Sequence, residues 1–104
     1  MNIPKKIKIL GIVYKVKFTD DLKKSISQYL DKKDKCRDFV GYCSTAQATI
    51  YLSSHTDKQT LGSVFIHEIL EAINVHMALS LKHNDIDRLE TALHQVLTEN
   101  NLLK

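Results

Sequence analysis

Apolar and polar side chains alternate with a period of two along the first 18 residues. Isoleucine and lysine take turns over residues 6–9, and a second alternating run ends at Phe18. Gly11 interrupts the pattern between the two runs. Because successive side chains of a strand point to opposite faces, this period is typical of half-buried strands. The pattern therefore predicts two strands joined near residues 10–12.

The middle of the chain switches between helical and strand patterns. Apolar residues recur at helical spacing over residues 20–33, which predicts an amphipathic helix with a lysine-rich outer face. The polar run 31–38 predicts a solvated connection. Two short strands follow, over residues 39–42 and 48–52, and β-branched and aromatic residues in the second favour β structure.

The last third of the chain predicts two helices. Residues 61–77 are apolar at almost every helical face, which indicates a buried helix. A second, amphipathic helix is predicted from Asn84 to about Asn100. The order strands, helix, strands, helix, helix predicts an α+β fold in which three helices pack on one face of a small, mostly antiparallel sheet. At 104 residues the chain is long enough for a single domain, over residues 1–104.

Composition narrows the class of protein. Hydrophobic residues make up 43% and charged residues 26% of the chain, which excludes disordered and fibrous proteins. No run approaches the roughly 18 apolar residues of a membrane span, and the first residues lack a signal-peptide pattern. We therefore expect a cytoplasmic protein with no membrane partner. The two cysteines, Cys36 and Cys43, are too few for a disulfide framework and are expected to be free thiols.

The buried helix contains three ionisable residues within five positions, His67, Glu68 and Glu71. Burying charged groups is costly unless they are paired or bind a metal. At 100° per residue His67 and Glu71 lie about 40° apart and one turn along the helix, so both can bind one cation. Glu68 can reach a water on that cation. This is the logic of the HExxH motif with glutamate at the last position. The alternative is an internal ion-pair or hydrogen-bond cluster.

A catalytic zinc ion needs a third protein ligand. His83 is the best candidate, because residues 79–82 break the helical pattern and can fold His83 back toward the ion. His67, Glu71 and His83 would form a two-histidine, one-carboxylate set, which suits Zn²⁺ and also Fe(II). Glu90 is a rival third ligand, although we favour it as the acceptor that orients a ligand histidine. His94 is a further alternative.

Three segments carry a resemblance to a known family. Residues 62–73 (GSVFIHEILEAI), 81–86 (LKHNDI) and 89–97 (LETALHQVL) resemble small phage and prophage proteins of the zincin-like metallopeptidase group. The spacing is also similar to that of SprT-like zincins, in which the third histidine precedes a helix. The resemblance covers mainly residues 37–100. It implies a minimal zincin fold with a metal between the last two helices, and with residues 48–52 as an edge strand that can pair with an extended peptide.

The leading hypothesis is a metal-dependent hydrolase, a small zincin-type peptidase of phage or bacterial origin. His67, Glu71 and His83 would hold the ion, and Glu68 would take the proton of the bound water. The competing hypothesis is a catalytically inactive zincin-like phage protein that acts as a protein-binding module, which Glu71 in the histidine position and the small size favour. Either way the expected partner is a peptide or protein. Nucleic-acid binding through the lysines is a third alternative that the scattered, modest net charge of +3 does not favour.

Overall fold

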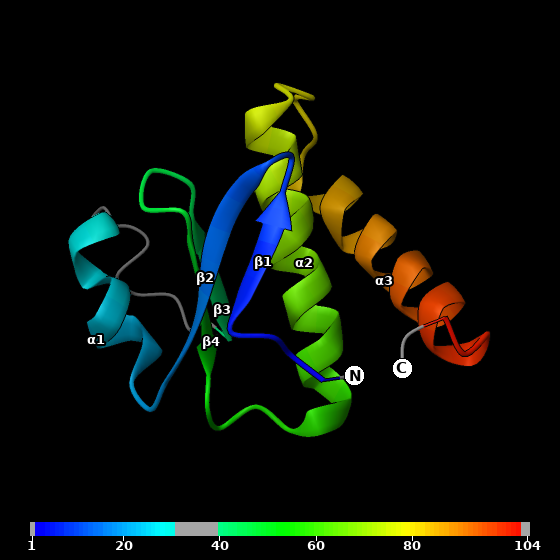
Figure 1. Cartoon of the computed structure of the whole chain (residues 1–104), viewed down its shortest axis with the longest axis horizontal. Helices are drawn as coiled ribbons and strands as arrows, with labels where there is room; N and C mark the ends of the chain where they lie inside the picture. Colours follow the sequence, from blue (N-terminus) through cyan, green and yellow to red (C-terminus); the bar gives the residue numbers. More distant parts are fainter. Residues whose placement is uncertain (1, 31–39, 103–104) are drawn as a thin grey trace.

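The computed structural model of the chain describes residues 2–30 and 40–102. Its architecture is α+β, as predicted, with one four-stranded sheet and three α-helices (Figure 1). The elements in chain order are β1 (Lys6–Ile9), β2 (Ile12–Thr19), α1 (Leu22–Ile26), the 3₁₀ turn η1 (Ser27–Tyr29), β3 (Gly41–Ser44), β4 (Thr49–Ser53), α2 (Lys58–His76) and α3 (His83–Glu99).

The sheet is mixed, with strand order β1-β2-β4-β3. β1 and β2 form the antiparallel hairpin that the alternating pattern predicts, and Leu10 and Gly11 make its turn. β2 and β4 run parallel, with Val16 opposite Ile50, and β3 pairs antiparallel with β4. Two of the three pairings are therefore antiparallel, and the parallel one lies at the centre.

The prediction that residues 48–52 form an edge strand is wrong. β4 has β2 on one side and β3 on the other, so both of its hydrogen-bonding edges are used. The reason is the crossover from β2 to the far side of the sheet, which brings the chain back through β3 before β4 fills the gap. The edge strand next to α2 is β3, and its Gly41 packs directly on that helix.

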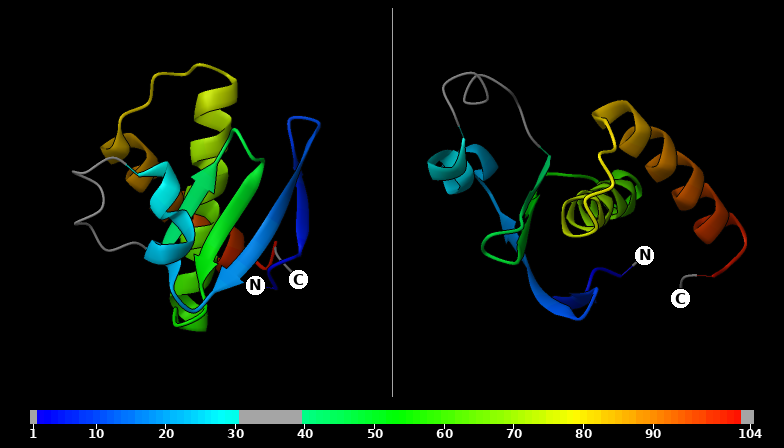
Figure 2. Two further views of the ribbon diagram at one scale, coloured as in Figure 1. Left: turned by 90° about the vertical axis from the view of Figure 1, so that its left-hand side faces the viewer. Right: turned by 90° about the horizontal axis from the view of Figure 1, so that it is seen from above.

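The helices cover both faces of the sheet, which corrects the prediction that they share one face. Ile50 and Leu52 point into the core toward Val64 and Phe65 of α2. Tyr51 alternates to the opposite face, where its ring lies 6.5 Å from that of Tyr29 in η1. Figure 2 shows α1 and α2 on opposite sides of the strands.

The boundaries of the predicted helices shift. The helix expected over residues 20–33 is shorter than predicted, because α1 ends at Ile26 and the chain continues as η1. The connection predicted over residues 31–38 lies outside the described part of the chain. α2 begins after Asp57, whose carboxylate accepts a hydrogen bond from the Thr60 backbone N–H at 2.9 Å. Within residues 2–30 and 40–102, no helix combines the length and apolarity that crossing a bilayer requires.

α3 packs on α2 and is separated from the sheet by it, as the right-hand view of Figure 2 shows. The two helices run in opposite directions and are joined by residues 77–82 (Figure 1). This antiparallel pair brings the start of α3 level with the middle of α2, where His67 and His83 lie side by side.

Candidate metal centre

The α2 side of the site consists of His67 and Glu71. His67 faces α3 with only 15% of its side chain exposed, and its Nε2 lies 3.6 Å from Oε1 of Glu71. The two residues are four apart in one helix, so their proximity follows from helix geometry alone. The pair expected from the sequence is therefore present.

The α3 side depends on the turn that follows α2. The Asn74 amide holds this turn from within α2: its Oδ1 accepts from the Leu81 N–H at 2.9 Å, and its Nδ2 donates to the Leu81 carbonyl at 3.2 Å. Two residues later the chain starts α3 at His83. His83 is thus the first helical residue and not, as expected, part of the connecting segment. Its ring centroid lies 5.3 Å from that of His67.

Asp87 is the site residue that the sequence does not single out. Its Oδ1 lies 3.3 Å from Nδ1 of His67, and its Oδ2 lies 3.4 Å from Nε2 of His83. One nitrogen of each histidine and one oxygen of Asp87 lie within 4.8 Å of one another, so together they could hold a metal ion. The signal is in the sequence, because His83 and Asp87 repeat the four-residue spacing of His67 and Glu71. Asp87 also fits the start of a helix, and spacing alone does not separate the two roles.

Glu90 orients the His67 ring. Nδ1 of His67 donates to Oε1 of Glu90 at 3.2 Å, and the Ser63 hydroxyl donates to the other carboxylate oxygen. With the proton on Nδ1, the lone pair of the imidazole is on Nε2, toward Glu71. A carboxylate that fixes the tautomer of a ligand histidine is the usual outer partner in metal sites. The structure thus places Glu90 in the contact expected for it.

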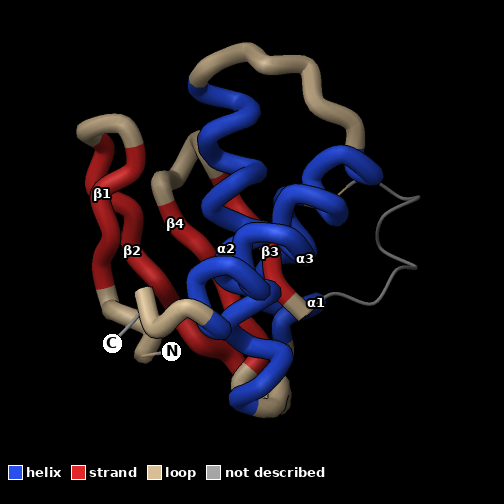
Figure 3. Tube along the Cα trace, turned by 90° about the vertical axis from the view of Figure 1, so that its right-hand side faces the viewer, coloured by secondary structure: helices blue, strands red, loops and turns tan. Residues whose placement is uncertain are grey.

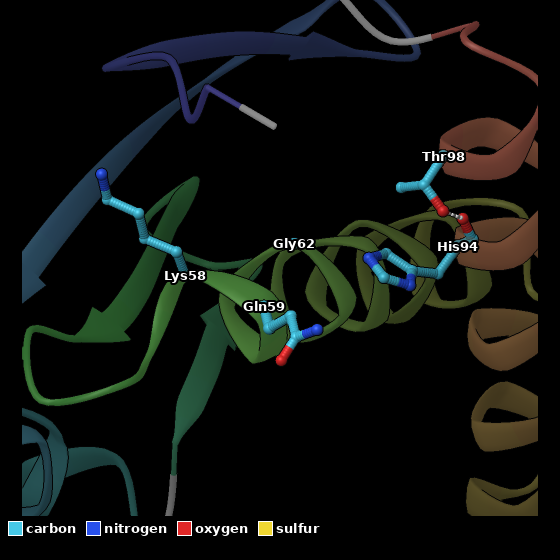
Figure 4. Close-up of a pocket in the computed structure, with 5 residues that line it drawn as sticks. All are labelled: Lys58, Gln59, Gly62, His94 and Thr98. Atoms are coloured by element: carbon cyan, nitrogen blue, oxygen red, sulfur yellow. Dashed lines mark hydrogen bonds between the residues drawn. The ribbon is translucent and has the colours of Figure 1, made fainter.

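His94 does not join this cluster. Its ring points from α3 toward the beginning of α2, as Figure 4 shows, and lines a hollow of 410 Å³. The other residues that line this hollow are Lys58, Gln59, Gly62 and Thr98. The groups that could share a metal with His67 and His83 therefore lie at the other end of the α2–α3 contact.

Glu68 is the most deeply buried ionisable side chain of the site, with 6% exposed. Burial, and then the negative charges of Glu71 and Glu90, raise the pKa of its carboxyl to about 8. Gly41 gives this carboxyl its room: a Cβ at position 41 would lie 2.9 Å from Oε2 of Glu68 and 2.7 Å from Cγ1 of Val64. The edge strand β3 and α2 therefore pack so closely at this point that position 41 has no room for a side chain.

Cys43 lies on β3 near the same carboxylates. Burial, and then the charges of Glu68 and Glu71, raise the pKa of its thiol to about 12. A thiol with a raised pKa is a poor nucleophile at neutral pH, which favours a packing role for Cys43.

Gly41→Ala should lower the free energy of unfolding by about 1–3 kcal/mol, because the added methyl group would clash with the side chains of Val64 and Glu68 on α2. Urea denaturation followed by circular dichroism measures this loss. Adding Val64→Ala should reduce the penalty of Gly41→Ala, because it removes the nearer of the two clashing groups. Equal penalties in both backgrounds would show that the close approach is not tight.

Cys43 should react slowly with iodoacetamide. A pKa of about 12 in place of 9.0 lowers the thiolate fraction at neutral pH by about 10³, and the rate should still be rising at pH 10, where an ordinary thiol levels off. Peptide mapping by mass spectrometry separates this cysteine from Cys36, and the unfolded protein in urea supplies the reference rate. A rate in the folded protein equal to that reference would contradict the prediction.

Comparison of the chain with protein-family models, with curated proteins and with solved structures gave no match. Any inference about the function of the chain therefore rests on its fold class and on the chemistry of its own side chains.

Proposed function

We propose that this chain is a metal-dependent hydrolase that cleaves peptides with a metal-activated water. The observation that carries the proposal is the convergence of His67, His83 and Asp87, whose ligand atoms lie within 4.8 Å of one another. This group lies against a helix that also buries the carboxyl of Glu68. A cation and a carboxyl that can take the proton of its water are the two parts that hydrolysis through activated water requires.

The donor set fits Zn²⁺ and also suits Fe(II), since two imidazoles and a carboxylate are common to both kinds of site. Asp87 and Glu71 are the two candidates for the third ligand of the metal ion. Asp87 contacts both histidines, whereas Glu71 lies 3.6 Å from the His67 nitrogen that faces away from Glu90. When bound, the ion would polarise a carbonyl group and acidify its water.

The residues around this set have separate tasks. Glu90, itself held by Ser63, keeps the His67 ring in one tautomer. A cation bound beside Glu68 would favour the ionised form of its carboxyl, which could then accept a proton from the attacking water and pass it to the leaving amine. β3 replaces residues 48–52 as the strand that would pair with an extended peptide, because it is the sheet edge beside α2.

One observation favours the competing function, a binding module without catalysis. The carboxylates of Asp87 and Glu90 already contact His67, and Asp87 also contacts His83, so these contacts can hold α2 to α3 with no cation. In that case the cluster would serve the shape of a surface that docks on another protein.

Zinc titration by isothermal calorimetry tests the metal site. The chelator-treated full chain should bind one Zn²⁺, and His83→Ala should weaken binding by at least 100-fold. His83 has 63% of its side chain exposed, so its removal should leave the fold intact. Asp87→Asn and Glu71→Gln then identify the carboxylate ligand, because Asp87 groups with both histidines whereas Glu71 faces the unprotonated Nε2 of His67; the variant that loses more affinity names the ligand. His94→Ala is the matched control and should bind as the wild type does; no stoichiometric binding of Zn²⁺ would refute the site.

Glu68→Gln tests catalysis. With zinc present, the variant should lose at least 100-fold of the hydrolysis rate on a fluorogenic peptide mixture, because an amide cannot accept the proton of water. Its zinc affinity should stay within a few-fold of the wild type. If the wild type binds zinc but cleaves no peptide, or if Glu68→Gln cleaves equally well, the binding-module function stands instead.

A further inference from the structure

The tip of the β1–β2 hairpin exposes three large apolar side chains. Leu10, Ile12 and Val13 are between 39% and 55% exposed, and only Gly11 lies among them. Single exposed apolar residues are ordinary, but three within four positions at a projecting turn are not. This end of the molecule is the upper end in Figure 1.

The backbone at this tip disfavours leucine. Leu10 has φ +51° and Gly11 φ +82°, the left-handed pair typical of a two-residue hairpin turn. Asparagine or aspartate is preferred at the first of these positions, since other side chains meet a steric cost there. The Leu10 side chain is mostly in solvent, so little core packing offsets that cost. Leucine at position 10 thus makes the turn less stable than asparagine or aspartate would.

A second apolar loop lies at the same end. Val75, Met77 and Leu79, at the end of α2 and just beyond it, are 46% to 55% exposed. The hairpin and the end of α2 are tied together by a hydrogen bond between the Tyr14 hydroxyl and Nε2 of His76. Figures 1 and 3 both show the hairpin turn and the α2–α3 connection projecting in the same direction.

Four lysines lie on the two strands that lead into the hairpin tip. Lys6, Lys8, Lys15 and Lys17 lie on the outer face of β1 and β2, all exposed, with Lys6 directly opposite Lys15. Like charges opposite one another destabilise a sheet. Within the described ranges 2–30 and 40–102 none of the four has a salt bridge. The fold therefore gathers lysines that look scattered in the sequence into one cationic group.

We propose that this end of the molecule docks on the surface of an anionic lipid bilayer. Leu10, Ile12 and Val13 enter the boundary between headgroups and acyl chains, while Lys8 and Lys15, the lysines nearest the tip, remain at the level of the negatively charged headgroups and Lys6 and Lys17 lie farther along the strands. A nucleic acid would pair with the lysines but leave the apolar tip in water. An anionic bilayer offers acyl chains for the apolar tip and negatively charged headgroups for the lysines. The docking is independent of the metal site, and it departs from the expectation of no membrane partner, which considered spanning segments.

Vesicle flotation tests the proposal with the full chain. The wild type should float with vesicles of phosphatidylcholine and phosphatidylserine at 3:1, and at least 10-fold less with phosphatidylcholine alone. Raising the salt from 0.1 M to 0.5 M should weaken the binding, because it screens the lysines. Absence of flotation with the anionic vesicles would overturn the proposal.

Leu10→Asn separates docking from folding. Asparagine suits the left-handed turn, so the variant should unfold at a higher urea concentration than the wild type and yet bind anionic vesicles about 10-fold less tightly. Leu102→Asn is the matched control, a 61% exposed leucine near the C-terminus, and should bind as the wild type does. Equal binding by Leu10→Asn and the wild type would overturn the role of the tip.

The lysines have a control of equal charge. Lys8→Gln with Lys15→Gln should weaken vesicle binding, whereas Lys23→Gln with Lys24→Gln on α1 should change it little. A labelled oligonucleotide that binds through Lys8 and Lys15, with vesicles left unbound, would assign the surface to nucleic acid and refute the membrane proposal.

Discussion

The candidate site depends on one constraint, the pair of hydrogen bonds by which Asn74 holds the backbone of Leu81. These bonds fix where the chain turns after α2 and so set the register between α2 and α3. With that register, His83 and Asp87 face His67. A one-residue change in the turn would rotate α3 by about 100° and carry both side chains away from α2. The chemistry of the site thus rests on a short loop held by a neutral amide.

Burial of Glu68 is the second feature on which the site relies. A buried carboxyl must either lose its charge or find a positive partner, and its raised pKa reflects the first of these. The absence of a side chain at Gly41 lets the backbone of β3 close over this carboxyl. The same packing holds the edge strand against α2, so the position of the carboxyl and the position of the strand are coupled.

The sequence predicted the elements better than their arrangement. The hairpin, the two long helices and the His67–Glu71 pair depend on local periodicity, and they lie close to where the pattern puts them. The place of β4 inside the sheet depends on a pairing with β2, which no local pattern encodes. The role of Asp87 is not predictable from local pattern for a related reason, since its partner His67 is 20 residues away on another helix. The exposure of Leu10 depends on turn geometry, which an alternating pattern does not reveal.

The parallel pairing of β2 with β4 has a consequence for how the chain folds. Lys15 pairs with Thr49, which are 34 positions apart, while the β1–β2 hairpin and the α2–α3 pair close over short loops. Closing the longer loop between β2 and β4 costs more chain entropy, and this cost comes before the stabilising contacts of the pairing form. The two local units can therefore form early, and the central pairing completes the sheet last. A newly made chain would expose the unpaired edge of β2 until β4 arrives, and this interval is when misassembly with other strands competes with folding.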